Sequence, residues 1–84
     1  MKDVAYIIKG KVRKKVLLSL KEKPKTATMI SKDLNVHRSS ISRSLLDLKN
    51  EGYARCENPD DDKYRFYKIT SKGLKLSEKM EGYK

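Results

Sequence analysis

Arginine and serine side chains gather in one short stretch near the middle of the chain, and their chemistry suits nucleic-acid recognition. Short hydroxyl side chains let a helix approach a DNA groove closely, and an arginine can donate two parallel hydrogen bonds to guanine. If the stretch is helical, Ile41, Leu45 and Leu48 fall on one side and polar residues face the other. The alternative is a solvated, serine-rich face that binds nothing. The residues predicted to face a DNA major groove are Arg38, Ser39, Ser40, Ser42 and Arg43, with Arg43 the best candidate for reading a base.

A second group of residues has the chemistry of phosphate contacts. Ammonium, hydroxyl and imidazole groups can each donate a hydrogen bond to a phosphate oxygen. Lysine-rich helices are equally often only solubility faces, so the interpretation rests on the group rather than on any single member. The predicted phosphate contacts are Lys14, Lys15, Lys25, Thr26, Lys32 and His37.

A third set of basic residues, Arg55, Lys63 and Arg65, flanks a turn that is strongly acidic. The turn contains three consecutive carboxylates, Asp60, Asp61 and Asp62, and phosphates repel such a cluster. We therefore expect only the base of this turn to contact DNA, or the tip to be held away from it. A solvated turn is a simpler interpretation than a weak Mg²⁺ site, because the alternating ligand spacing of a calcium loop is absent.

Apolar spacing and turn residues predict the helices that must hold these groups. Val12, Val16 and Leu20 recur every four residues and predict a helix over 9–22, which Pro24 terminates. Thr26 is a suitable N-cap for a short helix over Ala27 to Leu34, and Asn35 tolerates the left-handed conformation that ends helices. A third helix is expected from Arg38 to about Glu51, with Gly52 as its stop.

The second half of the chain changes in residue type, which predicts a β-hairpin followed by a last helix. Two runs rich in aromatic or β-branched residues, 53–57 and 64–70, surround the acidic turn. The last helix is expected over 71–81 with Ser71 as its cap, although Gly73 weakens its first turn. Most of the aromatic side chains are expected to pack in the core or the hairpin rather than stack on single-stranded bases: Tyr6, Tyr53, Tyr64, Phe66 and Tyr67.

Composition limits the classes of function. The 84 residues carry 21 Lys and Arg against 11 Asp and Glu, a net charge of +10, which favours a polyanionic partner. A chain this short is expected to be one small domain and a binding module rather than an enzyme. No glycine-rich phosphate loop or Cys/His pair is present, and Cys56 is the single cysteine, so no cofactor, catalytic residue or metal ligand is predicted. With no signal peptide or membrane span in the sequence, a cytoplasmic protein is expected.

From Gly10 to Gly73 the sequence resembles the winged helix-turn-helix of ArsR/MarR-like transcriptional regulators. The resemblance rests on Val12-Arg13-Lys14-Lys15-Val16-Leu17, Pro24-Lys25-Thr26, Ile30-Ser31-Lys32-Asp33-Leu34-Asn35-Val36, Arg38-Ser39-Ser40-Ile41-Ser42-Arg43-Ser44-Leu45, Leu48-Lys49-Asn50-Glu51-Gly52-Tyr53 and Tyr67-Lys68-Ile69-Thr70-Ser71-Lys72-Gly73. His37 departs from the pattern, because the family usually has Ser or Asp as N-cap there.

The resemblance implies a mostly α-helical fold with a small β-hairpin, in which a three-helix core is followed by a β-wing and a C-terminal helix. The whole chain, 1–84, is then one domain, with the helix-turn-helix at about 26–51, the wing at about 53–70 and the C-terminal helix at about 71–81. The family's metal-sensing branch uses paired cysteines, which this sequence lacks.

The expected function is that of a sequence-specific, double-stranded DNA-binding transcriptional regulator, acting as a homodimer without a membrane partner. Apolar residues at the two ends are candidates for the subunit interface: Val4, Tyr6, Ile7 and Ile8, and Leu74, Leu76 and Met80. Two alternatives remain open. One is an architectural protein that coats DNA without sequence preference, and the other is a winged helix used for protein contacts.

Overall fold

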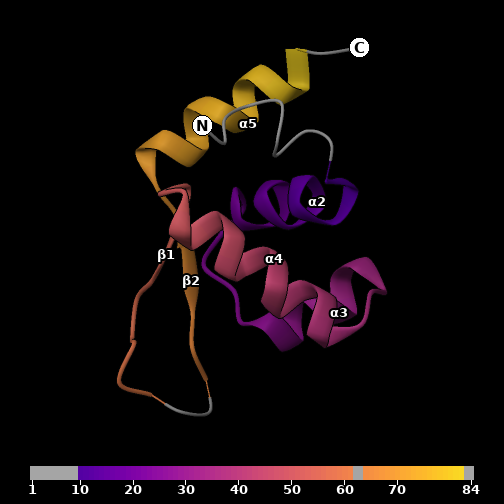
Figure 1. Ribbon diagram of the computed structural model, residues 1–84, viewed down its shortest axis with the longest axis vertical. Coiled ribbons are helices and arrows are strands. Elements are labelled where there is room, and N and C mark those ends of the chain that lie inside the picture. Colours follow the sequence, from indigo (N-terminus) through magenta and orange to yellow (C-terminus); the bar gives the residue numbers. More distant parts are fainter. Residues whose placement is uncertain (1–9, 62–63, 83–84) are drawn as a thin grey trace.

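The computed structural model describes residues 10–61 and 64–82, and it has the architecture of a winged helix (Figure 1). The elements follow in the order α2 (Lys11–Leu20), α3 (Ala27–Leu34), α4 (Arg38–Asn50), β1 (Ala54–Cys56), β2 (Tyr67–Ile69) and α5 (Ser71–Gly82). The two strands form an antiparallel hairpin. The expected fold class, mostly α with one small hairpin, is confirmed. The N-terminal apolar segment, Asp62 and Lys63 lie outside the described residues.

The core forms where four helices meet the start of the hairpin. Helix α2 packs on α4 from one side and α5 covers α2 from the other, while α3 packs against α4 (Figure 1). The apolar faces predicted from periodicity supply most of this core, which burial stabilises in proportion to the apolar area removed from water. The buried hydrophobic side chains are Val16, Leu17, Leu20, Ile30, Ile41, Leu45, Leu48, Tyr53, Ala54, Leu76 and Met80.

Helix α3 begins and ends at the predicted residues. The Thr26 hydroxyl accepts a hydrogen bond from the Met29 N–H at 3.1 Å, so Thr26 is the N-cap. Asn35 has a φ of 54° and a ψ of 49°, the left-handed conformation, and its N–H donates to the Ser31 carbonyl. The short turn that follows therefore leads directly into α4.

Helix α4 has no side-chain cap at its start. The His37 side chain makes no capping hydrogen bond, as expected where the usual Ser or Asp is replaced. At the other end Gly52 has a φ of 82° and directs the chain into the hairpin, which confirms its predicted role as the stop.

The loop before α3 pairs with the hairpin as a third, one-residue strand. Lys25 N–H donates to the Tyr67 carbonyl at 3.0 Å, and Tyr67 N–H donates to the Lys25 carbonyl at 2.9 Å. The hairpin is thus joined to the helix-turn-helix one residue before the Thr26 cap.

The strands are shorter than the aromatic runs that predicted them, because a side chain replaces the backbone ladder. The Asn58 amide oxygen accepts from the Phe66 N–H at 2.8 Å, and its NH₂ group donates to the Tyr64 carbonyl at 2.6 Å. Tyr64 and Phe66 are exposed, the former by 66%, and neither joins the core, so these two are exceptions to the packing expected for most of the aromatic residues. Tyr67 is half-buried against the core, as expected.

The predicted cap of the last helix is also wrong by one residue. The Thr70 hydroxyl accepts from the Gly73 N–H at 3.1 Å, and Ser71 is already the first helical residue. Leu76 and Met80 are buried in the chain's own core, so they offer no surplus surface for a dimer, contrary to expectation. Leu74 remains 40% exposed.

In the described part of the chain, no helix is both long enough and apolar enough to cross a membrane.

Candidate nucleic-acid interface

The outer face of α4 carries the predicted groove-facing residues. Its inner face is anchored by Ile41, Leu45 and Leu48, all buried, and this fixes the rotation of the helix. Four of the five predicted side chains are exposed, with Ser39 and Arg43 opposite the core and Arg38 and Ser42 on the flank, and Ser40 is half-buried. The exposed four are Arg38, Ser39, Ser42 and Arg43.

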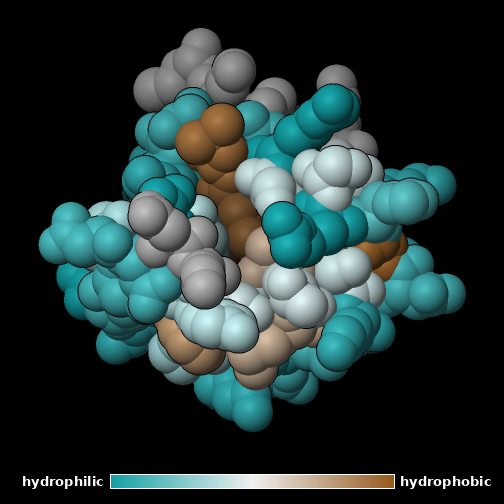
Figure 2. All heavy atoms as spheres, turned by 90° about the horizontal axis from the view of Figure 1, so that it is seen from below, coloured by the Kyte–Doolittle hydropathy of each residue, from teal (hydrophilic) through white to brown (hydrophobic). Residues whose placement is uncertain are grey.

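This face is free of negative charge. Asp47 is the one acidic residue within α4, and its carboxylate lies 3.3 Å from the Arg13 guanidinium of α2. The Asp47 carboxylate therefore faces α2, where the Arg13 guanidinium balances its charge. Two further exposed residues follow Arg43 along the same face, Leu46 and Asn50. Figure 2 shows the molecule from below, where a mainly hydrophilic surface surrounds a narrow hydrophobic strip.

A polar cleft of about 290 Å³ joins the start of α3, the start of α4 and the wing, residues 53–70. It brings together residues from all three predicted sets, although they are far apart in the sequence. Two guanidinium groups and four hydroxyl-bearing side chains line a space large enough for a phosphate group. The cleft residues are Thr26, Ala27, Thr28, Arg38, Ser42, Arg65 and Tyr67.

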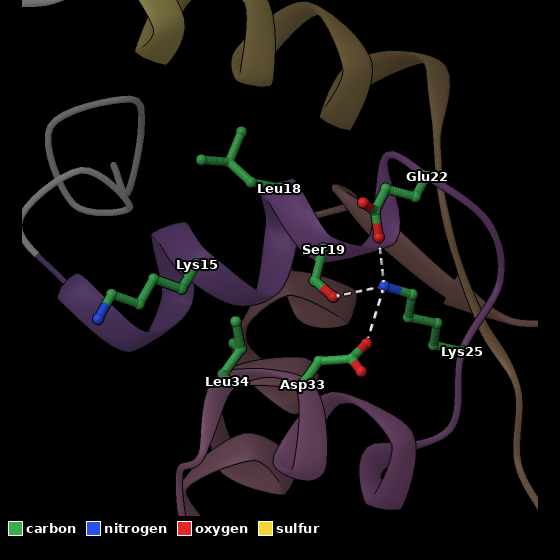
Figure 3. A pocket seen from close by; sticks show the side chains of 7 residues that line it. All are labelled: Lys15, Leu18, Ser19, Glu22, Lys25, Asp33 and Leu34. Atoms are coloured by element: carbon green, nitrogen blue, oxygen red, sulfur yellow. Dashed lines mark hydrogen bonds and ion pairs between the residues drawn. The ribbon is translucent and has the colours of Figure 1, made fainter.

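Lys25 is the predicted phosphate contact that the structure places elsewhere. Its side chain is only 4% exposed, and its ammonium donates to Glu22 at 2.6 Å, Asp33 at 3.1 Å and Ser19 at 2.9 Å (Figure 3). Its hydrogen bonds are committed to α2 and α3 rather than to a phosphate. Sequence reasoning missed this because a lysine between helices ordinarily points to solvent.

The acidic partners also control the ionisation of Lys25. Burial alone lowers the pKa of an ammonium group, but the hydrogen bonds and charges of Glu22 and Asp33 outweigh it and raise the pKa of Lys25 above 10.5. The group is therefore charged at neutral pH, and it links α3 to the turn that follows α2 by ion pairs and to α2 by the Ser19 hydrogen bond.

Of the five remaining predicted phosphate contacts, Thr26 is buried at 8% exposure and its hydroxyl accepts from the Met29 N–H. The other four lie on the surface. Lys15, Lys32 and His37 are exposed, and Lys14 is half-buried on α2. In Figure 3 the Lys15 side chain points away from the Lys25 cluster. These four side chains keep the accessibility that a phosphate contact requires.

The wing uses part of its charge to hold its own shape. Arg55 lies 3.4 Å from the Glu57 carboxylate, and the Arg65 side chain donates to the Asp61 carbonyl at 2.9 Å. The Asp61 carboxylate accepts from the Tyr64 N–H at 2.8 Å. At least one carboxylate of the acidic tip therefore stabilises the turn. Among the described residues, no group of three or more His, Cys, Asp or Glu side chains is arranged to hold a metal ion.

The fold is shared with solved transcription regulators. A MarR family transcription regulator superposes with a TM-score of 0.78 at 22% identity, covering 86% of this chain and 49% of that one. Wild-type apo MarR from Escherichia coli gives 0.76 at 26% identity, with 86% and 55% covered. Lactococcus lactis ZitR in complex with DNA gives 0.74 at 15% identity, with 84% and 49% covered. The chain thus spans about half the length of these regulators.

No match was found among curated protein sequences. A family model does match, however, and it covers residues 10–55, which include α2, the helix-turn-helix and the start of the hairpin. This match extends over more than half of the chain. The chain therefore belongs to the arsR family of bacterial regulatory proteins.

Proposed function

We propose that this chain is a sequence-specific, double-stranded DNA-binding transcriptional regulator that reads the major groove with α4. The observation that carries the proposal is the exposed surface of α4, which has no acidic side chain. Its N-terminal half carries Arg38, Ser39, Ser42 and Arg43. Arg43 can hold a guanine through two hydrogen bonds, while the serines permit close approach and Ser40 lies at the edge of the contact.

The phosphate path is proposed to run through the cleft between α3, α4 and the wing. Arg65 of the wing and residues 26–28 at the start of α3 both line that cleft, so one backbone phosphate there would fix the wing relative to the helix-turn-helix. Lys14, Lys15, Lys32 and His37 are proposed as peripheral contacts. Lys25 is omitted because its ammonium is occupied.

The proposed role of the wing is limited to its base. Arg55 and Arg65 are candidates there, and Lys63 remains a candidate on sequence grounds alone. The acidic tip would be repelled by the phosphates of a bound duplex. The DNA complex of ZitR, a protein of the same fold, supports nucleic acid as the partner.

We also propose that the regulator acts as a homodimer. The proposed contacts are the exposed Leu74 on α5 and the apolar N-terminal segment in the sequence. Two recognition helices would then meet half-sites about one helical turn apart, roughly 10 bp between centres. Sedimentation equilibrium with and without a selected duplex tests this proposal directly.

Selection of bound fragments from random duplex DNA, followed by competition at a fixed salt concentration, tests the function. A specific regulator should bind its selected site at least about 10³-fold more tightly than bulk DNA. Equal binding to every fragment, with only a steep salt dependence, would identify an architectural protein instead. The absence of DNA binding would favour protein contacts.

A further inference from the structure

Leu46 is an apolar exception on the polar face of α4. Its surface is 54% exposed, although its neighbours Leu45 and Leu48 are fully buried and hold the helix in place. Its exposure therefore follows from the fixed rotation of α4 and not from a loose helix end.

The neighbours of Leu46 on this face are groups that bind bases. Arg43 precedes it by three residues and Asn50 follows it by four, so the three side chains form one stripe. Asp47, the acidic residue next to it, is turned to Arg13. The stripe therefore contains no carboxylate of α4 that would be repelled by the phosphates of DNA.

The spacing of Arg43 and Leu46 fits neighbouring base pairs. Three residues of α-helix rise by about 4.5 Å, which is close to the step of about 3.4 Å between base pairs. A helix lying in the major groove with Arg43 on a guanine would bring Leu46 to an adjacent or next-adjacent pair. In that groove the apolar group on a base edge is the C5-methyl of thymine.

We propose that Leu46 is a specificity-determining residue, which selects a thymine beside the base pair read by Arg43 by packing on its C5-methyl group. The proposal rests on the proposed reading of the major groove by α4 and adds a second base type to its target. It treats the isolated leucine as a contact with DNA and not with a second copy of the chain.

The test uses the 84-residue chain and the duplex enriched from random DNA. Each thymine near the guanine whose recognition is lost in Arg43→Ala is replaced by deoxyuridine, which removes only the methyl group. For the unaltered protein, one such replacement should weaken binding about fourfold, the effect of losing one buried methyl. In Leu46→Ala the same replacement should have no further effect, whereas Leu46→Met should retain the sensitivity.

Because Leu46 is exposed, Leu46→Ala is expected to fold, and its circular dichroism spectrum checks this. The proposal is overturned if no thymine near the guanine is sensitive, or if the sensitivity persists in Leu46→Ala. It is also overturned if Leu46→Ala changes only the oligomeric state. In each of these cases a loss of guanine preference in Arg43→Ala would leave the proposed function standing. If the unaltered chain prefers no sequence at all, the proposed function itself fails.

Discussion

The α-carbon of Gly73 packs against the carbonyl oxygen of Tyr53, leaving no space for a side chain between them. A β-carbon at residue 73 would overlap that oxygen and also press on Ile69. The first turn of α5 can therefore lie directly on the start of the wing. Thr70 closes the same junction, since its N–H donates to the Tyr53 carbonyl at 3.0 Å and its hydroxyl to the Gly52 carbonyl at 2.6 Å.

Replacing Gly73 by alanine should destabilise the fold. Alanine is about 1 kcal/mol better than glycine inside a helix, but here the new methyl group must displace backbone. We expect a net loss of about 2 kcal/mol or more in the free energy of unfolding, measured by urea denaturation. Ser71→Ala, in the same turn and exposed, should stay within about 0.5 kcal/mol. A more stable Gly73→Ala protein would show that the junction is not tight.

Asn35 should tolerate glycine better than alanine. Its φ of 54° lies in the left-handed region, which costs a residue with a β-carbon roughly 1–2 kcal/mol. Asn35→Ala is expected to lose about 1 kcal/mol of unfolding free energy, and Asn35→Gly to remain within about 0.5 kcal/mol of the parent. Thermal and urea denaturation of the two variants make the comparison, and equal losses would contradict it.

Removal of the Lys25 ammonium should weaken the packing of α2 on α3. Lys25→Met keeps an unbranched apolar stem but loses the hydrogen bonds to Ser19, Glu22 and Asp33. Because both carboxylates are largely exposed and can rehydrate, we expect a loss of only about 1–2 kcal/mol in unfolding free energy. Lys23→Met, at an exposed position in the same loop, provides the control and should change little.

The contribution of Lys25 to the free energy of unfolding should also decrease at high pH. Its pKa is raised above 10.5 in the folded protein, so the folded state holds the proton more tightly than the unfolded chain. While both carboxylates are ionised, the stability difference between the parent and Lys25→Met should therefore be fully present at neutral pH and shrink as the pH rises through the folded pKa, which is raised. Denaturation curves at about pH 9 and about pH 11 measure it, and a difference that grows at the higher pH would refute the ion-pair account.

Arg43 and Lys32 should affect DNA binding in different ways. Arg43→Ala is expected to remove about 1–3 kcal/mol of discrimination at one base pair. Lys32→Ala should weaken binding to all sequences alike and reduce the salt slope by about 1. Titrations of selected and scrambled duplexes at several salt concentrations separate the two effects. Unchanged binding in both variants would rule out the groove model.

The helices could be predicted from sequence because local signals mark their ends. Thr26 and Asn35 bound α3, and the spacing of Ile41, Leu45 and Leu48 sets the rotation of α4. The family match confirms the expected resemblance to ArsR/MarR-like regulatory proteins. These features depend on neighbouring residues, which a linear sequence displays.

The features that escaped prediction depend on contacts between distant residues. The Lys25 ammonium is held by Ser19 of α2, by Glu22 in the turn after α2 and by Asp33 of α3. Thr70 rather than Ser71 caps α5 because the backbone at Gly52 and Tyr53 packs beneath it. The Asn58 side chain makes hydrogen bonds to the Tyr64 and Phe66 backbone that a paired strand would otherwise make. Tyr64 and Phe66 therefore lie in an irregular loop, although their residue types favour strands.

The pairing of Lys25 with Tyr67 has a mechanical consequence. Lys25 is bound to the wing through its backbone, and the next residue, Thr26, already caps α3. Any tilt of the hairpin is therefore transmitted to the first turn of α3 with no intervening residue to absorb it. The wing and the helix-turn-helix should therefore move together as one rigid unit, so that a displacement of either one also displaces the other.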